Sequence, residues 1–247
     1  MSNRISPKLL AEFIGTFAFV FIGAGTAAVV GDGVGLPGIV AIAFAHGLAI
    51  MAFAFAYGSV SGGHMNPAVT VGVLAAGAMS IGEAIGYIIS QLIGGVAGAL
   101  LLRTVLGGIE TGLGTPALAH NLVLGAVSLT ITPAAGFVIE ALLGFFLVTV
   151  VLSTAVAGRA GSLAPLAIGM TLTLNILMGG ALTGAPFNPA RALGPMVATG
   201  NFNDAWLYVT APIVGAIVAA VLHTGLTRLA QEGMAVGRRA SAQVPAE

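Results

Sequence analysis

The sequence predicts an all-α membrane protein with six transmembrane helices, two half-helices and an inverted repeat of three plus three spans. Three observations support this fold class. Of the 247 residues, 57% are hydrophobic and only 6% are charged, whereas a soluble domain carries about 25% charged residues. The apolar residues form long runs, which favour helices over the alternating strands of a membrane barrel. The tripeptide Asn-Pro-Ala occurs twice, each time interrupting an apolar stretch.

Six segments have about the 20 apolar residues that a membrane-spanning helix needs. Glycine-rich or proline-rich turns separate them, and they cover approximately Leu9–Val30, Ile39–Tyr57, Ala84–Leu106, Ala134–Val156, Leu163–Ala181 and Ala205–Leu229. The first has no small-residue cleavage site before a soluble domain, so we interpret it as a span and not as a signal peptide. Spaced glycines predict close helix packing at Gly82 with Gly86, Gly94 with Gly98, and Gly136 with Gly144.

The two halves of the chain resemble each other. Glu12 precedes the first Asn-Pro-Ala, and Glu140 precedes the second at a similar separation. Three spans per half is an odd number, so the second half must enter the membrane from the opposite face, which makes the repeat inverted. We expect one domain over residues 1–247, with repeats at approximately 9–106 and 134–229 that an external loop, 107–133, connects.

The distribution of basic residues predicts the orientation. With the N-terminus inside, Arg103 and Arg191 lie on the far side, and the remaining basic residues are cytoplasmic: Arg4, Lys8, Arg159, Arg228, Arg238 and Arg239. This bias follows the positive-inside rule and places both termini in the cytoplasm. Short loops without long tails suggest a multi-pass protein of a prokaryotic inner membrane.

Each Asn-Pro pair predicts the start of a short helix. Asn is a good N-cap, and proline suits the first helical position because the missing N–H is not needed there. Helices starting at Asn66 and Asn188 would run about ten residues to the next breaker and rise about 15 Å, half of a hydrocarbon core of about 30 Å. Their N-termini would meet at the midplane, where two positive dipole ends disfavour a cation.

The backbone before each half-helix cannot be helical. Non-helical backbone at membrane depth is tolerated where it is buried in protein or lines a cavity. The freed carbonyls would then line a path to the two asparagine amides, which are hydrogen-bond donors. We expect such carbonyls at Gly62, Gly63, His64, Gly184, Ala185 and Pro186. Acceptors that lead to a donor pair are suited to a small uncharged solute that forms hydrogen bonds.

These motifs closely resemble those of the aquaporin or major intrinsic protein family, over nearly the whole chain. The resemblance lies in Ser-Gly-Gly-His-Met-Asn-Pro-Ala-Val-Thr at 61–70 and Phe-Asn-Pro-Ala-Arg-Ala-Leu-Gly-Pro at 187–195, with the paired motif residues Asn66, Pro67, Ala68, Asn188, Pro189 and Ala190. It implies a passive channel for water and small neutral solutes, in a homotetramer within the lipid bilayer. The family has one pore in each protomer and needs no cofactor.

The resemblance also implies a four-residue selectivity filter. The matching positions are His46, Ile176, Ala185 and Arg191. Strict water channels look different, with an aromatic residue on the second helix and a histidine on the fifth. The set is most similar to that of plant tonoplast intrinsic proteins, some of which pass ammonia or urea beside water. Glycerol facilitators resemble one another in an Asp after the arginine, and Ala192 in its place counts against polyol transport.

Five further polar or aromatic residues could have a structural or functional role. Embedded carboxylates at Glu12 and Glu140 could serve acid–base chemistry, but we favour a structural role in which each accepts hydrogen bonds from its own interrupted loop. The role of His120, in the external connection, stays open. Trp206 and Tyr208 open the sixth span and resemble an interfacial belt.

Other classes of function have less support in the sequence. A glycerol or polyol facilitator and a non-conducting scaffold with the same fold remain alternatives. An intramembrane enzyme is disfavoured because the chain has no cysteine and no metalloprotease or serine-nucleophile motif. An ion-coupled transporter is disfavoured by the facing helix dipoles. We expect no metal, and the net charge of zero implies no nucleic-acid partner.

Overall fold

A computed structural model gives the backbone of residues 6–31 and 35–242 and the side chains of residues 6–31 and 37–232. Within these ranges six helices are long and apolar enough to cross a membrane, which confirms the predicted number. They are α1 (Pro7–Val30), α2 (Gly35–Ser61), α4 (Ile81–Val105), α5 (Pro133–Val151), α6 (Ala164–Thr183) and α8 (Ala205–Ala242). Arg4 and the side chains of Arg238 and Arg239, which entered the orientation prediction, lie outside the described part.

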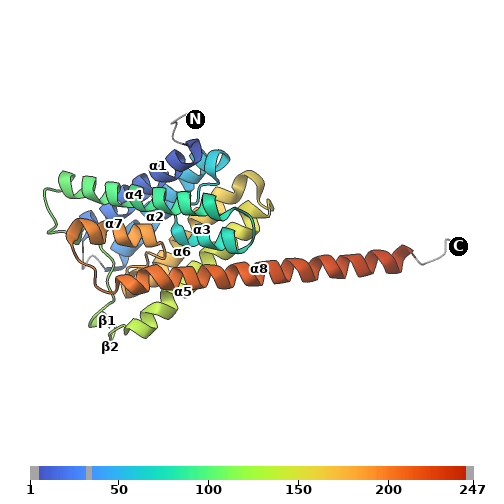
Figure 1. Cartoon of the computed structure of the whole chain (residues 1–247). Helices are drawn as coiled ribbons and strands as arrows, with labels where there is room; N and C mark the ends of the chain where they lie inside the picture. Colours follow the sequence, from blue (N-terminus) through green and yellow to red (C-terminus); the bar gives the residue numbers. More distant parts are fainter. Residues whose placement is uncertain (1–5, 32–34, 243–247) are drawn as a thin grey trace.

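The two half-helices are α3 (Pro67–Ala75) and α7 (Pro189–Thr199), and Figure 1 shows both of them between α4 and α8. With 9 and 11 residues, they rise about 14 and 17 Å at 1.5 Å per residue. Helix α3 packs on α4, α5 and α8, and helix α7 packs on α4, α8 and α1. Each half-helix therefore contacts the last span of the opposite half, which brings the two interrupted loops together.

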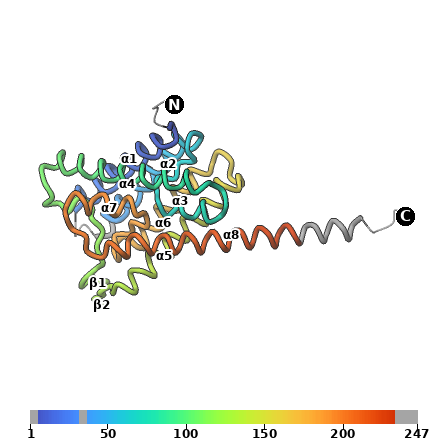
Figure 2. The backbone as a smooth tube through the Cα atoms, viewed as in Figure 1, coloured from blue at the N-terminus to red at the C-terminus, as the bar shows by residue number. Residues whose placement is uncertain are grey.

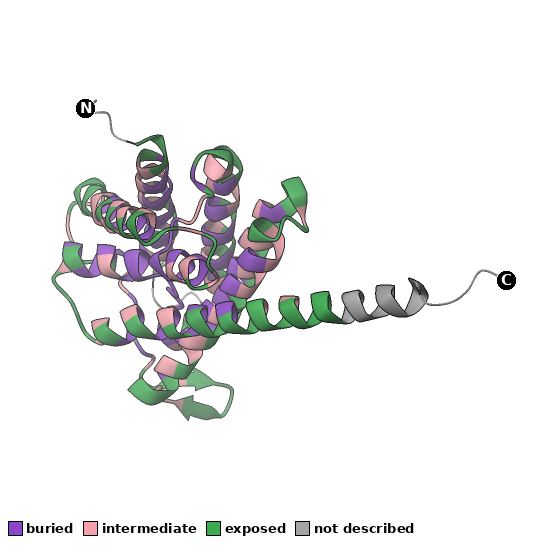
Figure 3. Cartoon of the chain, turned by 45° about the vertical axis from the view of Figure 1, so that its right-hand side comes forward, coloured by how far each residue is buried: buried purple, intermediate pink, exposed green. Residues whose placement is uncertain are grey.

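The long spans pack in the same order in both halves. Helix α1 lies against α2 and α4, helix α5 lies against α6 and α8, and α2 contacts α6 across the middle. Figure 3 shows buried residues on the inner faces of the spans and exposed residues on their outer faces. Many exposed side chains are large and apolar, as at Ile89, Leu142 and Val221. Apolar outer faces are what a helical bundle presents to lipid.

The connection between α4 and α5 contains structure that the sequence analysis did not predict. It forms a 3₁₀ turn, η1 (Gly112–Gly114), and a hairpin of β1 (Leu122–Leu124) and β2 (Val127–Leu129). The strands are antiparallel, with Leu124 opposite Val127. Gly125, with φ +60°, begins the tight turn between them. Figure 2 shows the hairpin beside the start of α5.

The connection between α5 and α6 also departs from regular α-helix. Helix α5 widens into a π-helical turn, η2 (Leu152–Val156), and a 3₁₀ turn, η3 (Gly161–Leu163), leads into α6. Helix α8 continues past the predicted end at Leu229. Its 38 residues make it about 57 Å long, nearly twice the hydrocarbon core, and Figure 1 shows it extending far from the bundle.

The predicted glycine contacts are confirmed in part. A Cβ atom at Gly94 would lie 2.5 Å from the carbonyl oxygen of Phe13, and one at Gly144 would lie 2.7 Å from that of Pro212. Helices approach most closely where no side chain separates them. The prediction for Gly82 is wrong, because its Cβ would meet no atom within 4 Å.

Candidate functional site

Each half-helix is preceded by a short loop in an unusual backbone conformation. In the first loop Met65 has φ +49°, and in the second Ala185 and Phe187 have φ +41° and +27°. Residues other than glycine rarely adopt such angles, and they persist only where the surroundings impose them. The N–H groups of Gly62 and Gly184 still bond to the preceding helices, but the later N–H groups of each loop have no helical ladder, so other groups must accept their hydrogen bonds.

The carboxylate of Glu12 holds the first loop. It accepts hydrogen bonds from the backbone N–H groups of His64, at 2.9 Å, and Met65, at 2.6 Å. It also accepts from Ser61 Oγ, at 2.7 Å, and from Gln91 Nε2, at 2.7 Å. Four donors therefore converge on one fully buried carboxylate, and hydrogen bonds to a charged acceptor are stronger than neutral ones.

Glu140 has the corresponding position in the second half, but it receives fewer bonds. It accepts from Thr183 Oγ1, at 2.6 Å, and from the N–H of Phe187, at 2.8 Å. Pro186 occupies the place that His64 has in the first loop, and proline has no N–H to donate. The second loop is therefore bound to its carboxylate through fewer contacts than the first.

The two asparagines cap their helices and also join them. Asn66 Oδ1 accepts from the N–H of Ala68 at 2.8 Å, and Asn188 Oδ1 accepts from the N–H of Ala190 at 3.0 Å. Asn66 Nδ2 donates to the carbonyl oxygen of Phe187 at 3.1 Å, and Asn188 Nδ2 donates to that of Met65 at 2.9 Å. The helix N-termini thus meet head to head, and each amide retains one further N–H.

His46 and Arg191 lie together, as the resemblance implies. The Arg191 Nε–H donates to His46 Nε2 at 3.3 Å, and the His46 Nδ1–H donates to the carbonyl oxygen of Ile42 at 2.8 Å. Arg191 Nη1 also donates to the carbonyl oxygen of Gly114 at 2.7 Å. Arg191 is 3% exposed, and no carboxylate pairs with it among the described side chains.

The other proposed site residues are apolar or backbone groups. Ile176 lies on α6 and Ala185 in the second loop, and both are buried. The residues expected to offer carbonyls, namely Gly62, Gly63, His64, Gly184, Ala185 and Pro186, all lie outside helices. His120 is exposed in the connection between α4 and α5, and we assign it no role.

Some residues that build the site were missed by the sequence analysis. Tyr87 and Tyr208 donate from their hydroxyl groups to the carbonyl oxygens of Ser61 and Thr183, at 2.7 and 2.9 Å. Tyr208 is therefore buried beneath the second loop, and its assignment to an interfacial belt was wrong. Trp206 is 56% exposed and stacks on Phe137, as a belt residue would. The matching contacts of the two tyrosines in the two halves could have revealed their role, but only with the repeat aligned.

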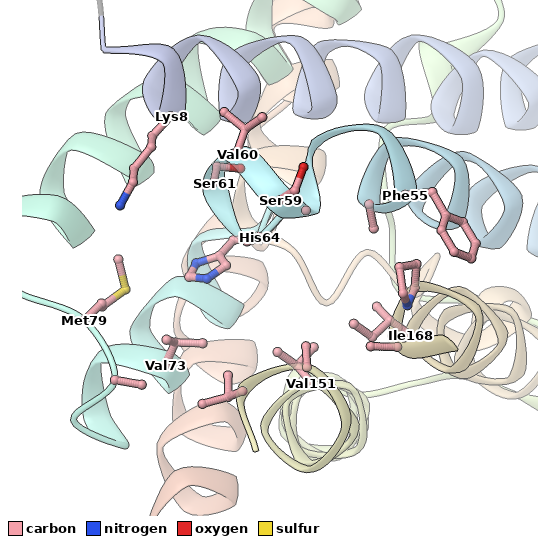
Figure 4. Close-up of a pocket in the computed structure, with 18 of the residues that line it drawn as sticks. Lys8, Phe55, Ser59, Val60, Ser61, His64, Val73, Met79, Val151 and Ile168 are labelled. Carbon is pink, nitrogen blue, oxygen red and sulfur yellow. The ribbon is translucent and has the colours of Figure 1, made fainter. Parts of the chain in front are cut away.

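A cavity of about 840 Å³ opens on the side of the first loop (Figure 4). Lys8 lies at its edge, and its Nζ atom forms an ion pair with Glu83 at 2.6 Å. Gly62 and His64 line its inner part, and Figure 4 shows the imidazole of His64 pointing into the cavity. The cavity therefore reaches the first interrupted loop. Within the described residues, no group of three or more His, Asp or Glu side chains could hold a metal ion.

The chain is similar to known proteins of one family. The family model described as "Major intrinsic protein" matches residues 2–223. Aquaporin TIP2-1 of Arabidopsis thaliana is 38% identical over 219 residues, which cover 87% of this chain and 84% of that protein. Aquaporin-2 of Ovis aries is 38% identical over 224 residues, which cover 90% and 79%.

A solved structure shows the same fold. The X-ray structure of the aquaglyceroporin from Plasmodium falciparum superposes with a TM-score of 0.73, over 88% of this chain and 95% of that one, at 23% sequence identity. The expected fold class and the resemblance to the tonoplast-type proteins are therefore confirmed. The chain belongs to the major intrinsic protein family.

Proposed function

We propose that this chain conducts water, and with it small neutral solutes such as urea or ammonia, passively across a membrane. Its relatives are named as aquaporins, and the family is one of channels, so the chain is a channel and not an enzyme. The observation that carries the proposal is the head-to-head contact of α3 and α7 through Asn66 and Asn188. This contact leaves one N–H group of each asparagine amide as a donor at the centre, and the nearby carboxylates of Glu12 and Glu140 already accept hydrogen bonds from the two loops.

The selectivity filter of this proposal consists of His46, Ile176, Ala185 and Arg191. Arg191 supplies a positive charge and N–H donors, which favour a solute that accepts hydrogen bonds and disfavour cations. His46 Nδ1 is occupied by Ile42, and its Nε2 accepts from Arg191, so the imidazole offers no N–H to a solute in this tautomer. Ile176 and Ala185 add apolar walls without a donor.

Protons and ions would be excluded in two places. A cation would approach the Arg191 guanidinium on one side and the positive ends of two helix dipoles at the asparagine pair. A solute would exchange hydrogen bonds with the carbonyls of the two loops instead of with bulk water. The path would end in the cavity of Figure 4, which Lys8 and Glu83 border.

The proposal includes topology and assembly. Residues 9–106 and 134–229 form two inverted repeats of one domain over 1–247, joined by the external loop 107–133. Both termini lie in the cytoplasm, and the protein is a homotetramer. The integral, multi-pass character is shown by the family and the six spans. A prokaryotic inner membrane has no support from the relatives described above, which are plant and animal proteins.

Stopped-flow light scattering on proteoliposomes tests this function. Reconstituted protein should accelerate osmotic shrinkage and the entry of urea and ammonia relative to empty vesicles, with glycerol slower than urea. In Ile176→His, water should still pass while urea entry falls, because a larger polar ring narrows the filter. Acceleration of water alone in the wild type would refute the wide filter, and no acceleration of any solute would refute the channel.

A further inference from the structure

We propose that Gly114, in the connection between α4 and α5, is a positioning residue of the selectivity filter. Its carbonyl oxygen holds the Arg191 guanidinium at the wall of the pore, and this contact keeps the pore open. The inference rests on the filter proposed above and adds a residue that is far from the Asn-Pro-Ala motifs in sequence.

The Arg191 side chain is held from two directions. Nη1 donates to Gly114 at 2.7 Å and Nε donates to His46 at 3.3 Å. The shorter of the two bonds is the one to Gly114. Both bonds have the charged guanidinium as donor and are therefore stronger than bonds between neutral groups. Because the bond to Gly114 is 0.6 Å shorter than the bond to His46, we assign the carbonyl the larger part in fixing the guanidinium plane.

Only glycine fits at this position. Gly114 has φ +66°, which an L-amino acid with a side chain rarely adopts. A Cβ atom there would lie 2.6 Å from the carbonyl oxygen of Ala24 and 2.9 Å from its Cα atom. These are backbone atoms of the fully buried part of α1, so they cannot rotate away, and a side chain at 114 would push the connection off α1.

The connection is also tied to the helix that carries the arginine. Leu113 is fully buried, and Thr115 Oγ1 lies 3.2 Å from Thr199 Oγ1. Arg103, in the last turn of α4 just before the connection, donates from Nη1 to the carbonyl oxygen of Ala198 at 3.0 Å. Thr199 and Ala198 lie at the end of α7. The connection is therefore held against α7 both at Thr199, the last residue of the helix, and at Arg191 near its start.

Loss of the contact between Arg191 and Gly114 should lower the permeability of the channel. Arg191 is 3% exposed, and in the proposed channel the space beside it that protein does not fill is the pore, so a released guanidinium would turn into the pore. A long cation that enters a narrow pore obstructs it. Larger solutes would be hindered more than water, so permeability to urea would fall more steeply than permeability to water.

The experiment compares Gly114→Ala with Gly112→Ala in proteoliposomes, with rates corrected for the amount of inserted protein. Gly112 lies in the same turn with φ +67°, but a Cβ there would meet nothing within 4 Å. G112A therefore introduces the same backbone strain without the collision. We expect G112A to keep water permeability within about twofold of wild type and G114A to lose at least about tenfold, the scale of one charged hydrogen bond.

The same substitution in an Arg191→Val background separates positioning from damage to the fold. If Gly114 acts through Arg191, G114A should change the permeability of R191V less than about twofold, because contacting residues are not additive. An equal loss in both backgrounds would overturn the inference. Leu113→Ala, which removes the buried anchor and keeps Gly114, should repeat the loss seen in G114A and serves where G114A does not fold.

The outcomes also distinguish this inference from the proposed function. A conducting wild type in which G114A equals G112A overturns the role of Gly114 alone. A wild type that conducts neither water nor urea above empty vesicles overturns the proposed function and this inference with it.

Discussion

Arg191 is a charged side chain at membrane depth whose hydrogen-bond partners are neutral. Its partners are an imidazole nitrogen and a backbone carbonyl, so its hydrogen bonds are satisfied while its charge is not compensated by an ion pair within the described residues. Embedded ionisable groups of this kind commonly mark a transport path. The charge of Arg191 should therefore interact with any solute that passes through the pore.

Replacing Arg191 by Val should raise the proton leak of proteoliposomes while water still passes. Two unit charges about 5 Å apart repel by about 3 kcal/mol at an effective dielectric constant of 20, so we expect at least a tenfold rise. A pH-sensitive dye inside the vesicles measures the leak. Arg159→Val, which removes an exposed arginine, should leave the leak unchanged. Equal leaks in R191V and wild type would mean that the asparagine pair alone forms the barrier.

The sequence predicts individual residues well where a local motif defines them. Asn66 and Asn188 were identified as helix caps because the Asn-Pro order has a local meaning, and the structure places them there. Gln91 and Gly114 were missed because their roles depend on tertiary contacts with Glu12 and Arg191. No spacing along the chain indicates such contacts.

At the scale of elements, the position of α7 depends on its close packing against α4. A Cβ atom at Gly95 would lie 2.6 Å from the carbonyl oxygen of Ala190, and one at Gly194 would lie 2.5 Å from that of Gly95. The two glycines therefore allow the half-helix that carries Arg191 to rest directly on a spanning helix. The filter is positioned by this contact between backbones.

Replacing Gly95 by Ala should separate α7 from α4, because the obstructing atoms belong to the backbone. Overpacking of this kind costs about 1–3 kcal/mol of the free energy of unfolding. We expect a lower thermal transition in detergent and slower water permeation. Gly82→Ala, on the same helix in open space, should match or slightly exceed wild-type stability. A G95A protein as stable as G82A would contradict the packing argument.

Element boundaries were predictable to within a few residues for the spans, since long apolar runs define them. The hairpin of β1 and β2 was not predicted, although two short apolar runs flank Gly125-Ala126 in the sequence. Strands of three residues give too little alternation to be recognised beside spans of twenty or more. The extension of α8 was not predicted because the helix continues beyond the apolar run that was used to place its end.

At the scale of the whole molecule, the proposed topology places the hairpin outside and the extension of α8 inside. The chain has no cysteine, so single cysteines can be added without removing others. Ser128→Cys in β2 and Gln231→Cys in α8 lie at exposed positions. In intact cells a membrane-impermeant maleimide should label S128C and not Q231C, and permeabilised cells should show both. The reverse pattern would invert the orientation.

The unequal anchoring of the two loops has a further consequence. Four donors fasten Glu12 in one half, whereas two fasten Glu140 in the other. Local opening of a protein begins where the fewest contacts must break. The second loop, beside Arg191, should therefore open at a lower temperature than the first. On warming, the protein would lose its discrimination among solutes before the bundle of transmembrane helices unfolds.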